Sequence, residues 1–216
     1  MTITRERFSQ GMSYEECKSK MPRNRELLEQ IERQLALSAE DLAPFRSLPQ
    51  SFDVLVLALD PCPDVATNLP ILERIAKETG KLNLRFFMRD DNKDLMAEFM
   101  NGPYESVPVF AFYDPAFNLR SVFIERPKSV TDVRAQKTRE IHSQHPEFGP
   151  VGGPAGDLAD DVRDRLRQAV YGMRADTQDF YVKETINDLR DLAKELGKSA
   201  SDGAAKWRGN LLAVPA

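Results

Sequence analysis

One cysteine stands at a position where thiol chemistry is favoured. The run Val54 to Leu59 is continuously apolar, which is typical of a central strand buried on both faces of a sheet. The chain then turns through the residues DPCPD, and from Val65 onward apolar residues recur at helical spacing. Cys62 is therefore expected at the junction between a strand and a helix N-terminus. Unpaired backbone N–H groups and the helix dipole at such a junction favour the thiolate, the form in which cysteine attacks.

Two carboxylates beside this cysteine act in the opposite direction. Asp60 and Asp64 flank Cys62, and a neighbouring negative charge raises the pKa of a thiol. The helix dipole contributes about 0.3–1 kcal/mol, which is comparable with the effect of one poorly screened carboxylate, so the direction of the net shift stays open. A functional Cys62 is expected to titrate below the ordinary value of about 8.5. The alternative is an inert cysteine at a structural turn.

The other cysteine, Cys17, has no spacing relationship to Cys62. The sequence around it predicts a helix, because Ser13 and Glu16 form a capping-box pattern and Pro22 interrupts the segment. The simplest interpretation of Cys17 is a small apolar residue on this helix. The alternative is a distant resolving cysteine, which requires the helix to lie across the turn at Cys62.

Neither a metal nor a nucleotide cofactor is expected. His142 and His145 would share a helix face, but no third ligand for a metal is in view. The run 90–94 resembles the start of a calcium loop, yet Leu95 stands where that loop needs glycine, so the run is interpreted as the beginning of a helix. The glycine pair at 152–153 follows no predicted strand, which argues against a phosphate-binding loop.

The composition predicts a globular protein outside the membrane. Of the 216 residues, 41% are hydrophobic and 30% are charged, and there is no apolar run of about 18 residues to span a bilayer. The first residues contain no apolar segment typical of a secretory signal, and two cysteines are too few for a disulfide scaffold. Because the net charge is −4, no nucleic-acid partner is expected. We therefore expect a cytoplasmic protein in a reducing environment.

The elements that must position Cys62 follow the order β-α-β-α-β-β-α. Strands are predicted at 54–59, 82–88, 106–113 and 119–125, and helices near 65–79, 95–100 and 130–145. This order predicts an α/β core, a mixed central sheet flanked by helices. Helical patterns also precede and follow the core. The predicted division is an N-terminal helical extension at 1–50, the core at 51–146, and a C-terminal helical extension and tail at 147–216.

The C-terminal extension is predicted to hold two amphipathic helices after a Pro/Gly-rich linker at 145–156. The last stretch, 197–216, is small and polar until Trp207. We expect this stretch to be loosely ordered unless Trp207, Leu211 and Leu212 dock on the rest of the protein.

This order of elements, the cysteine at the first strand-to-helix turn and a Val-Pro pair opening the third predicted strand resemble the thioredoxin superfamily. The stretches FSQGMSYEE, DLAPFRSLP, NLPILERIA, LNLRFFMRD and SVPVFAFYD are similar to thioredoxin-family proteins of bacteria that carry an added helical N-terminus. The resemblance runs from about Phe8 to Leu196 and implies a thioredoxin-like fold. It also implies a cis peptide bond between Val107 and Pro108, which would lie against the sulfur of Cys62.

The resemblance predicts the residues of the site as well. Cys62 is the expected catalytic nucleophile. The expected binding residues lie around its sulfur, in the turn or at the family's cis-proline: Pro61, Pro63, Asp64, Val107 and Pro108.

One departure from the family pattern bears on function. In thioredoxins a second cysteine, three residues after the first, releases the mixed disulfide; here that position is Val65. Two functions therefore stay open. The first is single-cysteine thiol–disulfide exchange, resolved by a low-molecular-weight thiol or by the thiol of a partner protein. The second is a non-catalytic binding module that holds an extended peptide by backbone pairing in the groove beside Cys62 and Pro108. The sequence decides neither whether the protein is an enzyme nor its oligomeric state.

Overall fold

The computed structural model describes residues 3–198 and 205–212. The chain divides into two compact units. The first, called the sheet unit, consists of Met1–Pro127 and Thr185–Ala216. The second, called the helical unit, consists of Lys128–Glu184.

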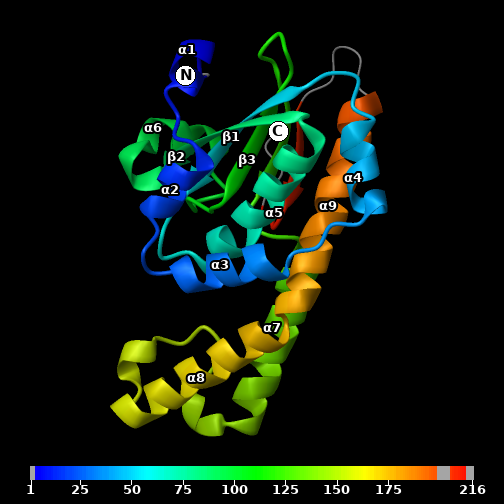
Figure 1. Ribbon diagram of the computed structural model, residues 1–216. Helices are drawn as coiled ribbons and strands as arrows, with labels where there is room; N and C mark the ends of the chain where they lie inside the picture. The colour runs from blue at the N-terminus through cyan, green and yellow to red at the C-terminus, as the bar shows by residue number, and fades with distance from the viewer. Residues whose placement is uncertain (1–2, 199–204, 213–216) are drawn as a thin grey trace. The chain divides into compact units, whose positions relative to one another are not determined.

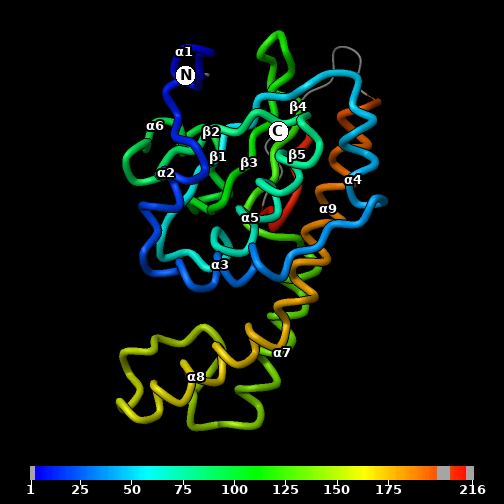
Figure 2. The backbone as a smooth tube through the Cα atoms, viewed as in Figure 1, coloured from blue at the N-terminus to red at the C-terminus, as the bar shows by residue number. Residues whose placement is uncertain are grey.

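A mixed sheet forms the centre of the sheet unit. Its strands in the described part of the chain are β1 (Phe52–Ala58), β2 (Leu82–Met88), β3 (Val109–Tyr113), β4 (Leu119–Ile124) and β5 (Lys206–Gly209). They lie side by side in the order β2-β1-β3-β4-β5 (Figure 1; Figure 2). Strand β2 is parallel to β1, β3 is antiparallel to both β1 and β4, and β5 is parallel to β4. The predicted mixed sheet is therefore confirmed.

Strand β1 and the helix after it are the elements that hold Cys62. Every residue from Val54 to Ala58 is completely buried, as the continuous apolar run predicts. Helix α5 (Pro63–Thr79) begins after a short turn, with Pro63 in the first helical turn, where its missing N–H costs nothing. Gly80 ends the helix at a φ of 64°, a left-handed conformation that favours glycine.

The N-terminal extension forms four helices among the described residues: α1 (Arg5–Ser9), α2 (Tyr14–Ser19), α3 (Arg25–Gln34) and α4 (Ala39–Arg46). Ser13 and Ser38 each cap a helix with a capping box, which confirms the predicted helix start at Ser13. The apolar stripes of α3 and α4 pack against α5 (Figure 1). Leu28 and Phe45 have no exposed surface there, so the extension joins the core of the sheet unit.

The connection from β2 to β3 is less helical than predicted. Instead of one helix near 95–100, it contains the single α-helical turn α6 (Lys93–Met96) between two 3₁₀ turns, η1 (Arg89–Asp91) and η2 (Ala97–Phe99). Leu95, Met96 and Phe99 are nevertheless buried, since tight 3₁₀ turns also place residues three apart on one side. The bond between Val107 and Pro108 is cis, as the resemblance implies. Strand β3 begins after this bond, later than predicted.

Strand β5 is an edge strand of the sheet, and it lies in a stretch where the sequence predicts no strand. It pairs with β4 from Ser121↔Lys206 to Ile124↔Gly209, and the Trp207 ring lies 6.2 Å from the ring of Phe99. A Cβ at Gly209 would lie 2.1 Å from the carbonyl oxygen of Ile124, so only glycine fits. Trp207 therefore docks on the sheet unit, whereas the side chain of Leu212, which was expected to dock with it, is exposed. Residues 199–204 and 213–216 of the predicted tail lie outside the described residues.

The helical unit contains α7 (Lys128–Gln144), α8 (Asp160–Asp176) and the beginning of α9 (Gln178–Lys198). The predicted linker between α7 and α8 forms two short 3₁₀ turns, η3 (Pro146–Phe148) and η4 (Ala155–Asp157). Helix α7 packs on α8 and η3. The predicted boundaries after residues 50 and 146 stay a prediction.

The later part of α9 belongs to the sheet unit. Leu189 is completely buried there, and Arg190 forms ion pairs with Glu40 and Asp41 of α4 at 2.5 and 3.3 Å. The C-terminal helix and the N-terminal extension therefore support each other within this unit.

Candidate functional site

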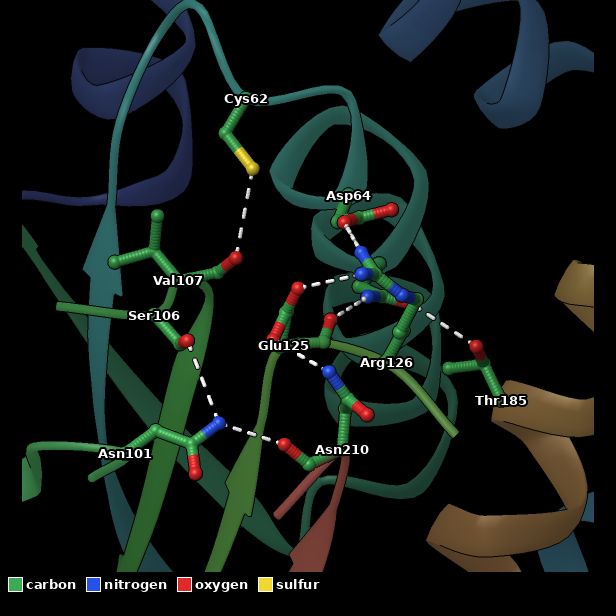
Figure 3. A network of polar contacts seen from close by, with 10 residues as sticks. Cys62, Asp64, Asn101, Ser106, Val107, Glu125, Arg126, Thr185 and Asn210 are labelled. Atoms are coloured by element: carbon green, nitrogen blue, oxygen red, sulfur yellow. Dashed lines mark hydrogen bonds and ion pairs between the residues drawn. The ribbon is translucent and has the colours of Figure 1, made fainter. Parts of the chain in front are cut away.

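Cys62 is the N-cap residue of α5, as its position between the apolar run and the helical pattern predicts. Its backbone N–H donates to the carbonyl of Leu59 at 3.2 Å, and its carbonyl accepts from Ala66 at 3.3 Å. The half-buried side chain points toward β3, and its Sγ–H donates to the carbonyl oxygen of Val107 at 3.4 Å (Figure 3). The structure therefore brings Cys62 and the cis-proline segment together, although they are 45 residues apart in sequence.

The predicted binding residues differ in their exposure. Pro61 is exposed and Pro63 is half-buried, whereas Asp64, Val107 and Pro108 are buried. A molecule that approaches from solvent therefore meets the turn around the cysteine before it meets the cis-proline. Their roles in binding stay a prediction.

The environment of Cys62 raises the pKa of its thiol. Burial of the sulfur is the largest cause, and the negative charge of Asp64 is the next. The backbone N–H groups of Val65 and Asp64 lower the pKa, as expected at a helix N-terminus, and the more distant carboxylate of Glu125 raises it slightly. The net shift of the Cys62 pKa, which the sequence left open, is therefore upward, contrary to the lowered pKa expected of a functional Cys62. The resting group is the protonated thiol, which donates to Val107.

The two aspartates of the turn, Asp60 and Asp64, make different contacts. Asp60 accepts the backbone N–H of Arg23 at 3.0 Å, and Asn24 donates to the backbone carbonyl of Asp60. The sequence predicts that Asp60 raises the pKa of Cys62, but the carboxylates that raise it are those of Asp64 and Glu125. Asp60 instead ties the N-terminal extension to the turn.

A charged cluster that the sequence analysis missed lies behind the turn. Asp64 forms an ion pair with the guanidinium of Arg126, which also contacts Glu125 at 2.7 Å (Figure 3). Glu125 follows β4 with a φ of 67°, and its N–H donates to the carbonyl of Pro108 at 2.7 Å. The signal in the sequence was a Glu-Arg pair at the end of the strand predicted to pair with the Val-Pro strand. Only the pairing register shows that this end reaches Asp64.

Buried amides and a hydroxyl extend this cluster. Asn68, which has no exposed surface, donates to the backbone carbonyl of Glu125 at 2.8 Å and accepts from the hydroxyl of Thr185 at 2.9 Å. On the other side, Asn210 follows β5 and donates from Nδ2 to Oε2 of Glu125 at 2.9 Å. Glu125 is therefore held by α5 through Asn68 and by the segment after β5 through Asn210, and Thr185 of α9 holds Asn68 in turn.

Cys17 lies in an apolar environment inside α2. It has no exposed surface, and burial raises the pKa of its thiol to about 12. Both cysteines are free thiols. A fully buried thiol cannot act as a resolving group without a large local opening, so its interpretation as a small apolar residue is the better one.

The metal-ligand candidates from the sequence have structural roles. His142 bonds through Nδ1 to the carbonyl of Gly149 at 2.8 Å, and the His145 ring stacks on Phe148 at 4.8 Å. Asp94 pairs with Arg7 instead of beginning a calcium loop. Across residues 3–198 and 205–212, no group of three or more His, Cys, Asp or Glu side chains is arranged to hold a metal ion.

No helix in the described ranges has both the length and the apolar character required to span a membrane.

Comparison with known proteins gives a family and a fold. The family model described as thioredoxin matches residues 11–139. Among solved structures, an HIV epitope-scaffold is 14% identical, with a TM-score of 0.58, over 90% of this chain and 98% of the scaffold. A protein of unknown function from Pseudomonas aeruginosa is 20% identical, with a TM-score of 0.55, over 81% of this chain and 96% of that protein. The search of curated proteins found no match.

Proposed function

The chain belongs to the thioredoxin family, and from this premise we propose that it carries out single-cysteine thiol–disulfide exchange with Cys62 as the nucleophile. One observation carries the proposal: the sulfur of Cys62 lies at the N-terminus of α5 and 3.4 Å from the carbonyl of Val107, the residue before the cis-proline. This is the arrangement that the family resemblance implies for an attacking cysteine.

The reaction proceeds in two exchange steps. The thiol first loses its proton to solvent, and the thiolate attacks a disulfide R–S–S–R to give Cys62–S–S–R and R–S⁻. A second thiolate, R′–S⁻, then attacks the mixed disulfide, releasing R–S–S–R′ and restoring the Cys62 thiolate. Val65 occupies the position of the family's resolving cysteine, so R′ is a low-molecular-weight thiol or the thiol of a partner protein. The exposed Pro61 leaves this side of the turn open to such a reagent.

The electrostatics of the site set the expected rate. Since burial and Asp64 raise the pKa of Cys62, only a small fraction of the thiol is ionised at neutral pH. We therefore expect slow exchange at pH 7 that accelerates as the pH rises. Two free thiols also fit a reducing compartment such as the bacterial cytoplasm, which we propose as the location.

The test is the formation of a mixed disulfide in the folded protein. Wild-type protein is incubated with oxidised glutathione between pH 7 and 10 and examined by intact-mass spectrometry. The expected product carries one glutathionyl group, absent from Cys62→Ser and retained in Cys17→Ser. Little reduction of a protein disulfide by thioredoxin reductase is expected without an added thiol. If Cys62 reacts only after unfolding, thiol exchange is excluded.

A second candidate function is a binding module that uses the groove beside Cys62 and Pro108 for an extended peptide. It is favoured by the raised pKa of the thiol and by the hydrogen bond through which the neutral thiol donates to Val107. In this case Cys62→Ser keeps full peptide binding, because a hydroxyl can make the same hydrogen bond. Binding of an extended peptide library to Cys62→Ser and wild-type protein separates the two functions.

A further inference from the structure

The segment after β5 reaches the Cys62 site through two hydrogen-bonded routes. Asn210, the first residue of this segment, contacts Glu125 through its side chain, and its backbone N–H donates to the carbonyl of Ile124 at 3.1 Å. Its backbone carbonyl accepts from Nδ2 of Asn101 at 2.6 Å. Figure 3 shows Asn210 between Asn101 and Glu125, and it shows the hydrogen bond from Cys62 to Val107, the residue after Ser106.

The first route runs along charged groups. Arg126 faces two carboxylates at once, since one nitrogen contacts Asp64 and another contacts Glu125 at 2.7 Å. Asn210 supplies a further donor to Glu125 at 2.9 Å. Asn210 donates one of the hydrogen bonds that Glu125 accepts. Glu125 therefore draws less strongly on the guanidinium of Arg126, which stays beside Asp64 and neutralises this carboxylate next to the sulfur.

The second route runs along the loop before the cis-proline. The amide of Asn101 is buried, with 1% of its surface exposed, and its Oδ1 accepts the backbone N–H of Leu212 at 2.8 Å. The same amide lies 3.4 Å from the hydroxyl of Ser106, the residue before Val107. Asn101 therefore holds the backbone of the segment after β5 and borders the loop before β3, in which the carbonyl of Val107 accepts the Cys62 thiol.

We propose that Asn210 is a positioning residue of the Cys62 site, and that by bonding Glu125 it keeps Arg126 on Asp64 and so supports the reactivity of the Cys62 thiol. The segment after β5 therefore contributes to the reactivity of Cys62, in addition to extending the sheet. This inference rests on the proposed role of Cys62 as the reactive group. The charged groups that act on the thiol are Asp64 from α5 and Glu125 from the end of β4, and Arg126 is paired with both of these carboxylates.

The direction of the effect follows from the shared guanidinium. In Asn210→Ala, Glu125 loses one donor and competes more strongly for Arg126, which leaves Asp64 less neutralised and the thiolate less favoured. Alkylation of Cys62 at pH 7.5 is expected to slow about two- to fivefold, with the pH profile displaced upward. Asn210→Asp places a further negative charge beside Glu125 and is expected to slow the alkylation of Cys62 more than Asn210→Ala does. Asn83→Ala, which removes an exposed asparagine bonded to Asp53 on β1, is the matched control and leaves the profile unchanged.

A double-mutant cycle separates positioning from a general structural effect. Full-length wild-type, Glu125→Gln, Asn210→Ala and the double variant are alkylated with iodoacetamide from pH 6.5 to 10, and their unfolding in urea is measured. Glu125→Gln alone is expected to accelerate alkylation, because it removes the charge that competes for Arg126 and also the direct effect of that charge on the thiol. In the Glu125→Gln background, Asn210→Ala is expected to have no further effect on the pH profile.

The outcomes are distinct. The inference is overturned if Asn210→Ala slows alkylation equally in the wild-type and Glu125→Gln backgrounds. It is also overturned if neither Asn210 variant changes the pH profile of alkylation. If Asn210→Ala does not fold, Glu125→Gln decides the matter, since an unchanged or slower rate contradicts the role of the shared guanidinium. Alkylation is independent of disulfide exchange. Wild-type protein that is alkylated but forms no mixed disulfide therefore rejects the proposed exchange reaction and leaves the positioning role standing.

Discussion

The two cysteines of this protein lie in contrasting surroundings. Cys17 is inside α2, its backbone N–H bonded to the carbonyl of Ser13, and no part of it is exposed. Cys62 is the N-cap residue of α5, half-buried, with N–H groups of α5 directed at the sulfur and a carbonyl oxygen 3.4 Å away. The chemistry of a thiol thus depends on where its helix places it.

Burial raises the pKa of both cysteines, but only Cys62 has backbone N–H groups that lower it. For Cys17, burial raises the pKa to about 12, and only Lys20 lowers it. For Cys62, two backbone N–H groups counteract burial and the charge of Asp64. The comparison predicts that Cys62 is slow but accessible to reaction, whereas Cys17 contributes to stability.

The largest expected difference is in labelling of the native protein. At pH 8 a thiol with a pKa of about 12 is ionised in only about one molecule in 10⁴, and Cys17 is also shielded from reagent. Cys62→Ser is therefore expected to remove essentially all iodoacetamide labelling of folded protein, and Cys17→Ser to leave it unchanged. Mass spectrometry of tryptic peptides after timed labelling measures both. Rapid native labelling of Cys17 contradicts the comparison.

The pH dependence of stability tests the buried thiol. A cysteine in the unfolded chain titrates at about 8.5, whereas Cys17 in the folded protein titrates at about 12. Its contribution is complete below the unfolded value and is lost as the pH rises toward the folded value, by about 1.4 kcal/mol per pH unit. Between pH 8 and 10, the free energy of unfolding of wild-type protein should therefore fall by about 2 kcal/mol more than that of Cys17→Ala. Parallel urea-unfolding curves for the two proteins count against a protonated buried thiol.

A second thiol placed beside Cys62 is expected to change the reaction class. Val65→Cys restores the spacing of the family's dithiol motif and supplies the missing resolving group. Reduction of insulin with dithiothreitol as the electron source should increase on the order of tenfold over wild type. Val65→Ser, which has similar size but no thiol, should show no gain. A Val65→Cys protein no faster than Val65→Ser indicates that the groove does not admit a protein disulfide.

The smallest expected effect concerns the charge beside Cys62. Asp64→Asn removes the second-largest cause of the raised pKa, so alkylation at pH 7.5 should accelerate about two- to fivefold and the midpoint should move down. Asp94→Asn breaks another aspartate–arginine pair, with Arg7, and serves as the control without effect on Cys62. If Asp64→Asn slows alkylation, the ion pair with Arg126 matters for the shape of the turn more than for its charge.

Much of the fold was predictable because its signals are local. The apolar run before Asp60, the alternation in β2 and the Asp114–Asn118 turn between β3 and β4 each specify an element within a few residues. Helix starts at Ser13 and Ser38 were equally local, because a capping box involves residues only three apart. The position of Cys62 at a helix N-terminus followed from the same kind of pattern.

Strand β5 was not predictable in this way. Its four residues have no apolar periodicity, and it is held by backbone pairing to β4 and by the contact between Trp207 and Phe99. Backbone hydrogen bonds carry no sequence signal, so the edge that brings Asn210 to the site is visible only in the folded chain.

The sequence by itself determined the thioredoxin-like α/β architecture, the cysteine at the first strand-to-helix turn and the missing resolving thiol at Val65. Only the tertiary structure decided the state of that cysteine. Its pKa depends on burial and on Asp64, and the charge of Asp64 is balanced by Arg126, 62 residues further along the chain. Electrostatic effects depend on distance in space and on exclusion of water, and both are set by packing between elements that the sequence lists far apart.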